Sequence, residues 1–508
     1  MKTKGTVFLV GAGPGDPQLL TLRGAELLRR ADVVILDALA SRELLRLVPS
    51  TAEVIERSRA RDLSQEALNA LMIERAGRGQ TVVRLKGGDP YIFGRGGEEA
   101  GSLAKAGIPF EVVPGVSSIT AVPNYAGIPL THRDHCSSFT VITGHEDPAG
   151  DEGRIDWDRI AREPGTKVVL MGAERIERLA EDLQARGMSP TTPVAMVREG
   201  TTGRQRSVSG TLADISERAA QADLSAPAIT VIGSVVNLRD RLNWFETRPL
   251  FGQRVVVTRA RDQAEALSQP LRERGADVLE VPCLKFGPPS VREPLIEAMA
   301  GLGEYNWMVF TSANGVTVFF DLFFKAYKDL RDLGGSRIAA VGPATATKLE
   351  SLHLQVDAMP KEYVGRQVAK AIAEVEGVEN LRILLVRAET ANPELVRVLE
   401  EQGAIVDDVP CYQTLAENGD WNGAAARLQE QGADWVTFAS GSAVEHFHAR
   451  FDLASLRRKF PGLKLASIGP ETTKALAALS LQPEVEAKTH TMEGLVTALE
   501  TARRRQTR

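Results

Sequence analysis

The chain has 508 residues, 43% of them hydrophobic and 25% charged, which is the balance of an ordinary globular protein with about three domains. A formal net charge of −5 argues against a general attraction to nucleic acid or to an anionic membrane surface. No apolar run reaches the about 18 residues of a membrane span, nothing at the start resembles a signal peptide, and three dispersed cysteines fit neither a disulfide framework nor a zinc site. We therefore expect a cytoplasmic protein with no nucleic-acid or membrane partner.

Strands and helices alternate from the start of the chain. Residues 6–10 indicate a strand, residues 19–30 have helical apolar spacing, and residues 31–36 indicate a second strand that ends at Asp37. The pattern continues through the segments VVRLK, FEVVPG, SFTVITG, TKVVLMG, TPVAMV and AITVIG. It predicts the α/β class, in which ligands bind where strands end in glycine or a turn.

The most distinctive stretch runs from Arg84 to Glu99, with the sequence RLKGGDPYIFGRGGEE. It begins as the end of a β-branched strand and breaks at two glycines, which permit positive φ and leave no side chain between backbone and ligand. Pro90 fixes the exit direction, and a helix is expected to start near Glu98, where acids suit the helix dipole. The stretch predicts a loop that cradles a ligand, with an ordinary tight turn as the alternative.

Residues 11–24, GAGPGDPQLLTLRG, follow the first strand and approach the G-x-G-x-x-G fingerprint of dinucleotide-binding proteins. They depart from it at Pro14 and at Asp16, whose carboxylate would repel a pyrophosphate at the start of a helix. NAD is therefore the weaker alternative. S-adenosylmethionine fits better, because it carries a sulfonium cation and no phosphate.

The second half contains an internal repeat. Three pairs of blocks lie 128 residues apart (RVVVTRA and ILLVRAE, GADVLEVPC and GAIVDDVPC, WMVFTSANGV and WVTFASGSAV), and a fourth pair, VGPATATKL and IGPETTKAL, lies 127 residues apart. Long repeats of this kind build two similar lobes that enclose a cleft. The VPC segments are expected to carry the chain between the lobes, and residues 284–286 and 412–414 are expected to pair as a short ladder.

The boundary between the halves is expected in the segment WFETRPLFG, residues 244–252, which contains a proline and a glycine and precedes a new strand. This divides the chain into residues 1–247 and 248–508. Within the second half, the repeated segments TSANG and ASGSA each end a strand and open a helix. Their hydroxyl groups either bind carboxylates or serve as helix N-caps, which makes candidates of Thr311, Ser312, Ser440 and Ser442.

The motifs of the first half, among them GAGPGDP, RLKGGDPYIFGRGGEE, YAGIPLTHRD and REGTTGRQRSVSGTL, resemble uroporphyrinogen-III C-methyltransferase of the tetrapyrrole methylase family over about residues 5–245. The resemblance implies a two-domain fold that binds S-adenosylmethionine between its lobes and releases S-adenosylhomocysteine. It also implies a homodimer formed through this half. The cofactor contacts that it implies are Pro14, Gly87, Gly88, Asp89, Ile92, Ser117, Ser118, Met171, Gly200 and Ala228.

Methyl transfer to a pyrrole carbon is an in-line displacement at the sulfonium, for which the protein mainly supplies alignment, followed by removal of the ring proton. The resemblance implies that Asp37 is the base; a role as helix N-cap is the alternative. The substrate carries eight carboxylates, which arginine binds in bidentate fashion. The basic residues in or beside the motifs either bind this substrate or are ordinary surface charges: Arg84, Lys86, Arg95, Arg133, Arg198, Arg204 and Arg206.

Two segments need separate comment. The family often carries a lysine assigned as a proton donor, but the corresponding region here, VIERSRARD at residues 54–62, has none. Arg57 or Arg59 can supply a charge there, although arginine does not release a proton near neutral pH. The loop THRDHC, residues 131–136, holds two histidines and a cysteine without a further cluster, so we interpret it as lining the tetrapyrrole site rather than binding a metal.

The paired lobes of the second half resemble uroporphyrinogen-III synthase over about residues 252–503. That reaction closes hydroxymethylbilane with loss of water and inversion of the last ring, and it uses no cofactor. Tyr363, in PKEYVGR, resembles the tyrosine proposed as donor to the leaving hydroxyl. Because the synthase product is the methyltransferase substrate, we predict a bifunctional enzyme that makes precorrin-2 for the siroheme or cobalamin branch. The alternatives are a methyltransferase for a later corrin position, and a second half that only binds a tetrapyrrole.

Overall fold

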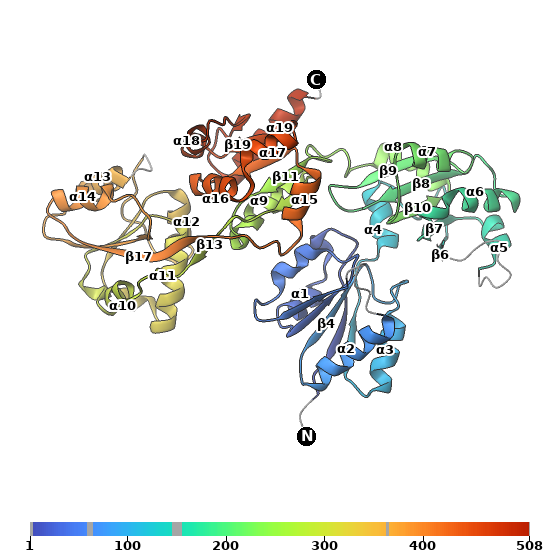
Figure 1. The fold of residues 1–508 in the computed structure, drawn as a ribbon, viewed down its shortest axis with the longest axis horizontal. Helices are drawn as coiled ribbons and strands as arrows, with labels where there is room; N and C mark the ends of the chain where they lie inside the picture. Colours follow the sequence, from blue (N-terminus) through green and yellow to red (C-terminus); the bar gives the residue numbers. More distant parts are fainter. Residues whose placement is uncertain (1–3, 58–63, 145–154, 362–364, 507–508) are drawn as a thin grey trace. The chain divides into compact units, whose positions relative to one another are not determined.

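The computed structural model describes residues 4–57, 64–144, 155–361 and 365–506. The chain forms two compact units, many of whose elements are labelled in Figure 1: Met1–Val281 with Gly419–Arg508, and Pro282–Asn418. Among the described residues, the first unit contains three five-stranded sheets and the second contains one. The chain therefore leaves the first unit at Pro282 and returns to it at Gly419.

The first sheet is parallel throughout, with the strand order β3-β2-β4-β1-β5. α1 (Leu22–Leu28) covers one face, and α2 (Gln65–Gly77) and α3 (Gly96–Lys105) cover the other (Figure 1). Val10 packs under α1, whereas its neighbour Leu9 packs under α2 and α3, because successive side chains of a strand point to opposite faces. The strands are β1 (Val7–Gly11), β2 (Val33–Leu36), β3 (Glu53–Glu56), β4 (Val82–Lys86) and β5 (Phe110–Val113).

This strand order places a topological switch between β4 and β1, since the chain continues from β1 past β4 to β2, and from β4 past β1 to β5. Ligands of open α/β sheets bind outside the carboxyl ends of strands at such a point. The loops that leave those ends begin at Ala12, Asp37, Gly87 and Pro114. The motifs of the first half are therefore gathered at one edge of one sheet.

The second sheet has the order β6-β7-β10-β8-β9, and only β6 and β7 are parallel. α5 (Trp157–Arg162), α6 (Ile176–Ala185) and α7 (Ile215–Gln221) pack on one face, and α4 (Ser118–Tyr125) packs on the other. α4 follows β5 in the chain, so it connects the first sheet to the second. The strands are β6 (Phe139–Thr143), β7 (Thr166–Leu170), β8 (Pro193–Arg198), β9 (Arg206–Thr211) and β10 (Ala228–Ile232), and α8 (Arg239–Leu242) follows them.

The third sheet of the first unit is parallel, with the order β12-β11-β18-β19-β20. Its strands are β11 (Arg254–Val257), β12 (Asp277–Glu280), β18 (Trp435–Phe438), β19 (Lys464–Ser467) and β20 (Val485–Glu486). Its helices are α9 (Arg261–Glu273), α15 (Ala424–Gln431), α16 (Gly441–Phe451), α17 (Leu453–Lys459), α18 (Pro470–Ala478) and α19 (Met492–Gln506). The domain boundary predicted between residues 247 and 248 falls inside this unit, where Arg272 of α9 forms an ion pair with Glu43 at 2.5 Å.

The second unit has one sheet, with the order β13-β17-β16-β14-β15. Its strands are β13 (Leu284–Gly287), β14 (Trp307–Phe310), β15 (Arg337–Ala340), β16 (Arg382–Ala388) and β17 (Ile405–Ala416). Its helices are α10 (Glu293–Ala300), α11 (Ala313–Ala326), α12 (Pro343–Glu350), α13 (Gly365–Val375) and α14 (Glu394–Glu401). β13 pairs antiparallel with the end of β17, which confirms the predicted ladder, but residues 284–286 pair with residues 414–416, two residues later than predicted. Among the helices described in the chain, none is long and apolar enough to cross a membrane.

The internal repeat is shared between the two lobes. Arg254 of β11 and Arg382 of β16 are equivalent positions, 128 residues apart, as are Trp307 of β14 and Trp435 of β18. Yet β11 pairs with β18 in the first unit, and β16 pairs with β14 in the second. Each lobe thus combines the first part of one repeat with the second part of the other. The chain crosses at the first VPC segment as expected, whereas the second VPC segment lies inside β17 and the crossing follows it.

Three glycines let the motif loops of the first sheet approach one another. A Cβ atom on Gly115 would lie 2.2 Å from the carbonyl oxygen of Gly88 and 2.7 Å from the Cα atom of Gly11. Gly88 itself has a φ of +62°, in the left-handed region that favours glycine. Any side chain at Gly115 would therefore push the loops after β1, β4 and β5 apart.

We predict that Gly115→Ala destabilises the fold by about 1–3 kcal/mol, the usual cost of an overpacked site. The measurement is the midpoint of thermal unfolding. Gly101→Ala is the matched control, since Gly101 lies in α3 and a Cβ atom there would have nothing within 4 Å. That substitution should raise the midpoint slightly, because alanine favours a helix by up to about 1 kcal/mol. Equal midpoints for the two variants would contradict the proposed close approach.

Candidate active site

The loops after β1 and β4 are joined by backbone hydrogen bonds. The N–H of Gly88 donates to the carbonyl of Gly13 at 2.8 Å, and the N–H of Gly13 donates to the carbonyl of Gly88 at 3.3 Å. The carboxylate of Asp89 accepts from the backbone N–H groups of Tyr91 at 2.8 Å and Gly115 at 3.1 Å. These contacts hold one set of predicted cofactor residues at the same sheet edge: Pro14, Gly87, Gly88, Asp89, Ser117 and Ser118.

Asp16 links this edge to the domain that contains the second sheet, β6–β10, which we call the second domain. Its backbone N–H donates to Oγ1 of Thr201 at 3.1 Å, and its carboxylate accepts from the phenol of Tyr125 at 3.0 Å and the backbone N–H of Gln18 at 2.9 Å. Burial and the neighbouring carboxylate raise the pKa of Tyr125, so the phenol remains a donor. Asp16 is therefore committed to internal contacts at the start of the short helix η1 (Pro17–Leu19), where a pyrophosphate would need free N–H groups.

Three predicted cofactor residues of the second domain also share an edge. β10 runs antiparallel to β7 and β8, so Ala228 at its start pairs with Arg198 near the end of β8. Met171 follows β7 directly, with a φ of +55° and 46% of its surface exposed. A Cβ atom on Gly200 would lie 2.6 Å from the side chain of Val122 in α4. The edge that carries Met171, Gly200 and Ala228 therefore adjoins α4, whose first residue is Ser118.

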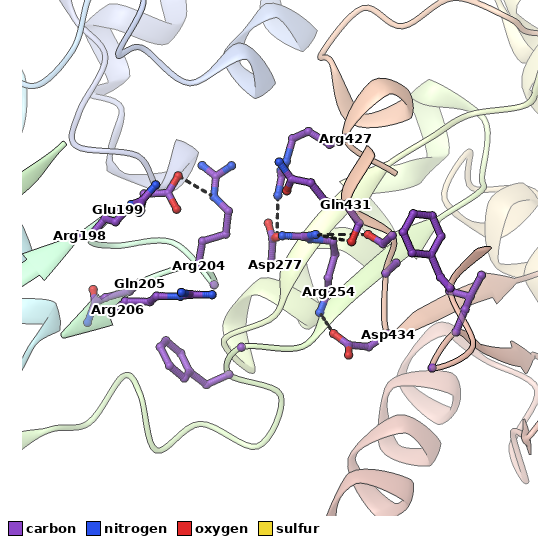
Figure 2. Close-up of a pocket in the computed structure, with 18 of the residues that line it drawn as sticks. Arg198, Glu199, Arg204, Gln205, Arg206, Arg254, Asp277, Arg427, Gln431 and Asp434 are labelled. Carbon is purple, nitrogen blue, oxygen red and sulfur yellow. Dashed lines mark hydrogen bonds and ion pairs between the residues drawn. The ribbon is translucent and has the colours of Figure 1, made fainter. Parts of the chain in front are cut away.

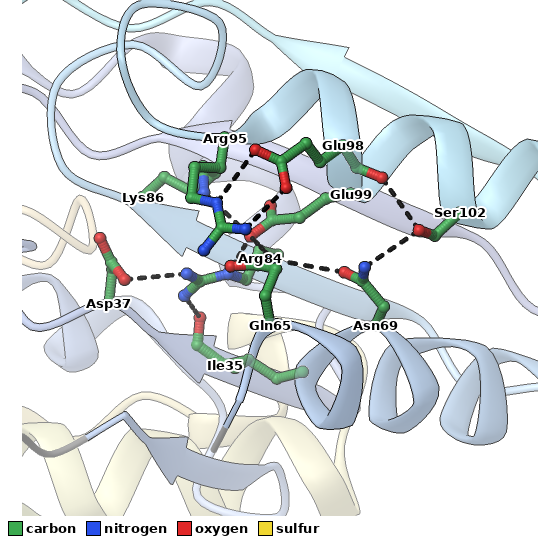
Figure 3. A network of polar contacts seen from close by, with 10 residues as sticks. All are labelled: Ile35, Asp37, Gln65, Asn69, Arg84, Lys86, Arg95, Glu98, Glu99 and Ser102. Atoms are coloured by element: carbon green, nitrogen blue, oxygen red, sulfur yellow. Dashed lines mark hydrogen bonds and ion pairs between the residues drawn. The ribbon is translucent and has the colours of Figure 1, made fainter. Parts of the chain in front are cut away.

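A buried charge network lies behind the loop after β4 (Figure 3). Arg84 is fully buried, and its guanidinium donates to Asp37 at 2.8 Å and to Glu99 at 3.4 Å. The same oxygen of Glu99, Oε1, accepts from Lys86 at 3.0 Å and from the amide of Gln65 at 3.2 Å. Two cations thus balance two carboxylates, as buried charges require.

This network controls the ionisation of Asp37. Burial raises the pKa of Asp37, but the charge and hydrogen bond of Arg84 and the charges of Lys86 and Arg57 outweigh that effect, so the pKa lies below its ordinary value. Burial and the like charge of Arg84 lower the pKa of Lys86, against the attraction of Glu99. Asp37 is consequently a carboxylate at neutral pH, held in place by a buried arginine. In residues 54–62, where the family often carries a lysine, Arg57 is described by the structure and Arg59 lies outside the described residues.

The network is only partly visible in the sequence. The motifs predict substrate contacts for Arg84 and Lys86, but both side chains are buried against Glu99. The sequence pattern explains Glu99 only as an acid that suits the start of α3. The sequence does contain one sign of this network. Arg84 and Lys86 are two residues apart, and therefore on one face, in an otherwise apolar strand, and two buried cations need a carboxylate to balance them.

Of the other predicted substrate residues of the first half, Arg95, Arg133 and Arg206 are exposed, and Arg198 and Arg204 are half-buried. Arg95 is in the left-handed region with a φ of 59°, and its guanidinium forms two hydrogen bonds with Glu98, at 3.0 and 2.7 Å. Arg133 lies at the tip of the THRDHC loop, which is closed by backbone hydrogen bonds between His132 and Cys136. Among the described residues, no group of three or more His, Cys, Asp and Glu side chains could hold a metal ion.

In the second half, two of the predicted carboxylate binders cap helices. Oγ of Ser312 accepts from the N–H of Gly315 at 3.0 Å and lies 3.0 Å from the phenol oxygen of Tyr412. Oγ of Ser440 accepts from the N–H of Ala443 at 3.2 Å and lies 3.1 Å from Oγ of Ser442. Thr311 precedes the first cap, and its N–H donates to the carbonyl of Val386. Ser312 and Ser440 are therefore helix N-caps, the alternative that the sequence left open. Tyr363 lies outside the described residues.

Comparison with known proteins matches each half of the chain to a protein family. Residues 6–216 match the family of Tetrapyrrole (Corrin/Porphyrin) Methylases, and residues 265–497 match Uroporphyrinogen-III synthase HemD. The chain is 38% identical over 498 residues to "Porphyrin biosynthesis protein HemD" of Ruminiclostridium josui, covering 97% of each chain. The chain belongs to both families. The family resemblance and the α/β fold class predicted from the sequence are thereby confirmed.

Two further relatives match the methylase half alone. The S-adenosyl-L-methionine-dependent uroporphyrinogen III methyltransferase of Methanosarcina barkeri is 48% identical over 241 residues, which is 47% of this chain and 94% of that protein. The crystal structure of Uroporphyrin-III C-methyl transferase from Thermus thermophilus, complexed with S-adenyl homocysteine, is 39% identical and covers 46% of this chain and 100% of that chain, with a TM-score of 0.40. A fusion of the two families is an enzyme of tetrapyrrole biosynthesis.

We predict that Arg84→Met shifts the acidic limb of the methyl-transfer rate profile to higher pH. Arg84 holds the pKa of Asp37 down, so its removal raises that pKa and extends protonation of the carboxylate upward. The measurement is kcat/KM as a function of pH, which reports ionisations of the free enzyme. Arg78→Met is the control, because Arg78 is exposed and pairs with Glu74 on α2. An unchanged acidic limb in an active Arg84→Met variant would contradict the role of Arg84.

Proposed function

We propose that the chain converts hydroxymethylbilane to precorrin-2 in two stages. The synthase half closes the ring to uroporphyrinogen III, and the methyltransferase half methylates that product twice with S-adenosylmethionine. The observation that carries the proposal is the meeting of the motif loops at one sheet edge beside an ionised Asp37, in a chain whose second half belongs to the synthase family. The product enters the siroheme or cobalamin branch.

The residues of the first half fit S-adenosylmethionine better than a dinucleotide. Gly88 and Gly115 present bare backbone, and Asp16 occupies the position where a pyrophosphate would bind. Ile92 and Met171 are exposed apolar side chains, 39% and 46% accessible, that an adenosyl group would cover. When bound, the cofactor supplies an electrophilic methyl group. The residues proposed to hold it are Pro14, Gly87, Gly88, Asp89, Ile92, Ser117, Ser118, Met171, Gly200 and Ala228.

Asp37 is proposed to take the proton that leaves the pyrrole carbon after methyl transfer. Its pKa is lowered, so it is ionised and ready at neutral pH, but it is a weak base. Alignment of the two reactants must therefore account for much of the acceleration. Arg84 and Lys86, being buried, act on Asp37 rather than on the substrate, whereas the exposed Arg95 and Arg133 are proposed to bind substrate carboxylates.

The synthase half is proposed to work without a cofactor. Its tasks are to fold the bilane and to donate a hydrogen bond to the departing hydroxyl, and Tyr363 is the proposed donor. Hydroxyl groups at helix starts suit carboxylates, because unpaired N–H groups and the helix dipole favour negative charge there. Thr311, Ser312, Ser440 and Ser442 are proposed to bind the bilane in this way. The family resemblance also supports a cytoplasmic homodimer formed through the methyltransferase half.

Product identification tests the whole proposal. Incubated with hydroxymethylbilane alone, the chain should release uroporphyrinogen III, and with added S-adenosylmethionine it should release the dimethylated product. Asp37→Asn should still form uroporphyrinogen III but methylate it about 10²- to 10⁴-fold more slowly, the usual effect of losing a general base. Mass spectrometry and isomer analysis of the products distinguish these results. Release of only the type I isomer would reduce the second half to a binding module.

We predict that Tyr363→Phe slows the synthase by about 10- to 100-fold and leaves methyl transfer unchanged. A phenol is a weak acid, with an ordinary pKa near 10, so its hydrogen bond assists departure of the hydroxyl without being essential. The measurement is the rate of type III isomer formation. Tyr327→Phe is the control, since its phenol donates to the Met299 carbonyl in the same unit. Equal rates for Tyr363→Phe and wild type would remove Tyr363 from the mechanism.

A further inference from the structure

A cleft of about 1030 Å³ lies within the first unit, where residues 198–206 of the methylase half face the synthase lobe (Figure 2). Its charged lining consists of four carboxylates and six cations, although the chain as a whole has a net charge of −5. The carboxylates belong to Glu199, Asp223, Asp277 and Asp434. The cations are Arg198, Arg204, Arg206, Arg254, Arg427 and Lys459.

Two of the arginines donate to one buried carboxylate, and the charge of a third acts on it. Oδ2 of Asp277 accepts from Nε of Arg254 at 2.9 Å and from Nη2 of Arg427 at 2.7 Å (Figure 2). Burial raises the pKa of Asp277, but the charges of Arg427, Arg204 and Arg254 outweigh it and hold the pKa below its ordinary value. Arg204 itself lies 3.4 Å from Glu199. Arg254 and Arg427 therefore share one counter-ion, and Arg204 acts on the same carboxylate through its charge.

Some guanidinium donors in the cleft have no partner among the described residues. Among the described residues, the guanidinium of Arg427 donates only through Nη2, and the exposed guanidinium of Arg206 has no hydrogen-bond or ion-pair partner. Burial lowers the pKa of Arg427, and the like charges of Arg204 and Arg254 add to this effect. Like charges held together in a partly buried cleft attract an anion, whose binding relieves their repulsion.

Both halves of the chain contribute to this cleft. Arg198, Arg204 and Arg206 come from β8, β9 and the loop between them, whereas Arg254 and Arg427 come from the synthase lobe. The two surfaces touch at Gly203, where a Cβ atom would lie 2.2 Å from the backbone nitrogen of Asp277. Glu199, which also lines the cleft, adjoins Gly200, one of the proposed cofactor residues.

We propose that this cleft binds the carboxylates of a polycarboxylated tetrapyrrole that passes from the synthase half to the methyltransferase half. The inference rests on the proposed function and adds a binding site between its two reactions. Guanidinium groups bind carboxylates in bidentate fashion, and several of them on opposite walls suit a ligand with carboxylates around its rim. A cleft lined by cations also raises the local concentration of an anionic ligand, which favours transfer over release.

The first test is binding of uroporphyrin III, a stable octacarboxylate probe, followed by its fluorescence. Arg204→Gln/Arg427→Gln should raise the dissociation constant of full-length protein at least tenfold, because two charge-assisted contacts are lost. Arg159→Gln is the control outside the cleft and is charge-matched to the single variant Arg206→Gln; Arg159 is exposed, pairs with Glu163 and does not line the cleft. Arg206→Gln serves as a second variant that breaks no ion pair, with a smaller effect expected.

Two outcomes of the binding test would overturn the site. One is an unchanged dissociation constant in folded Arg204→Gln/Arg427→Gln and in Arg206→Gln. The other is displacement of uroporphyrin III by an equal concentration of inorganic phosphate, which would indicate a general anion site. Weaker binding of coproporphyrin III, which has half as many carboxylates, supports the proposal, as does a loss of affinity at high salt.

The second test follows the transfer itself. Labelled hydroxymethylbilane is converted in the presence of S-adenosylmethionine and an unlabelled pool of uroporphyrinogen III. Wild type and Arg159→Gln should retain more label in the methylated product than complete mixing with the pool allows. Arg204→Gln/Arg427→Gln should fall to the mixed value. Its synthase rate and its methylation of saturating uroporphyrinogen III are measured alongside, so that the retained label is compared at known rates of both reactions.

The outcomes separate this inference from the proposed function. If wild type makes no type III isomer or methylated product but binds uroporphyrin III through these arginines, the function fails and the site stands. If both reactions proceed and wild type and Arg204→Gln/Arg427→Gln retain the same fraction of label, the function stands and the transfer site is overturned. Loss of methylation of saturating uroporphyrinogen III in Arg204→Gln/Arg427→Gln would assign these arginines to the methyltransferase site and also overturn it.

Discussion

The ion pair between Arg84 and Asp37 is the contact on which the proposed chemistry of the first half depends. A carboxylate taken out of water becomes harder to ionise, and a base that is protonated at neutral pH cannot accept a proton. The buried arginine reverses that effect, and it can be buried only because Glu99 balances Lys86 beside it. The lowered pKa also makes Asp37 a weaker base, so alignment of the reactants must account for more of the proposed catalysis. The same buried network therefore both balances its own charges and sets the ionisation of Asp37.

Alignment in turn depends on how closely the motif loops approach. Gly88 and Gly115 bring the loops after β4 and β5 to a separation that no side chain allows. Asp16 then connects this edge to the second domain through Thr201 and Tyr125. The same residue that departs from the dinucleotide fingerprint is therefore a structural tie between two sheets. A ligand held at this edge would be oriented by backbone rather than by flexible side chains, which suits an in-line displacement.

The fusion of the two families has a structural consequence beyond their proximity in sequence. One lobe of the synthase half packs with the methylase half in a single compact unit, joined by the ion pair of Arg272 with Glu43 and by the contact of Gly203 with Asp277. The cleft beside that contact has cations from both families on its walls. Under the proposed function, this positive charge favours retention of an anionic intermediate by the protein between the two reactions.

The order of strands and helices, the two families and the repeat in the second half all follow from the sequence, because periodicity, glycine position and motif spacing are local properties. The gathering of the GAGPGDP and KGGDP loops could be expected too, since parallel strands carry their loops at one edge. Tertiary structure alone decided which charges are buried: Arg84 and Lys86 resemble substrate ligands in the sequence, and only the fold places Glu99 against them. It also decided that each lobe takes part of both repeats, and that Asp277 gathers arginines from distant segments. Such contacts join residues far apart in the chain, and no local pattern records them.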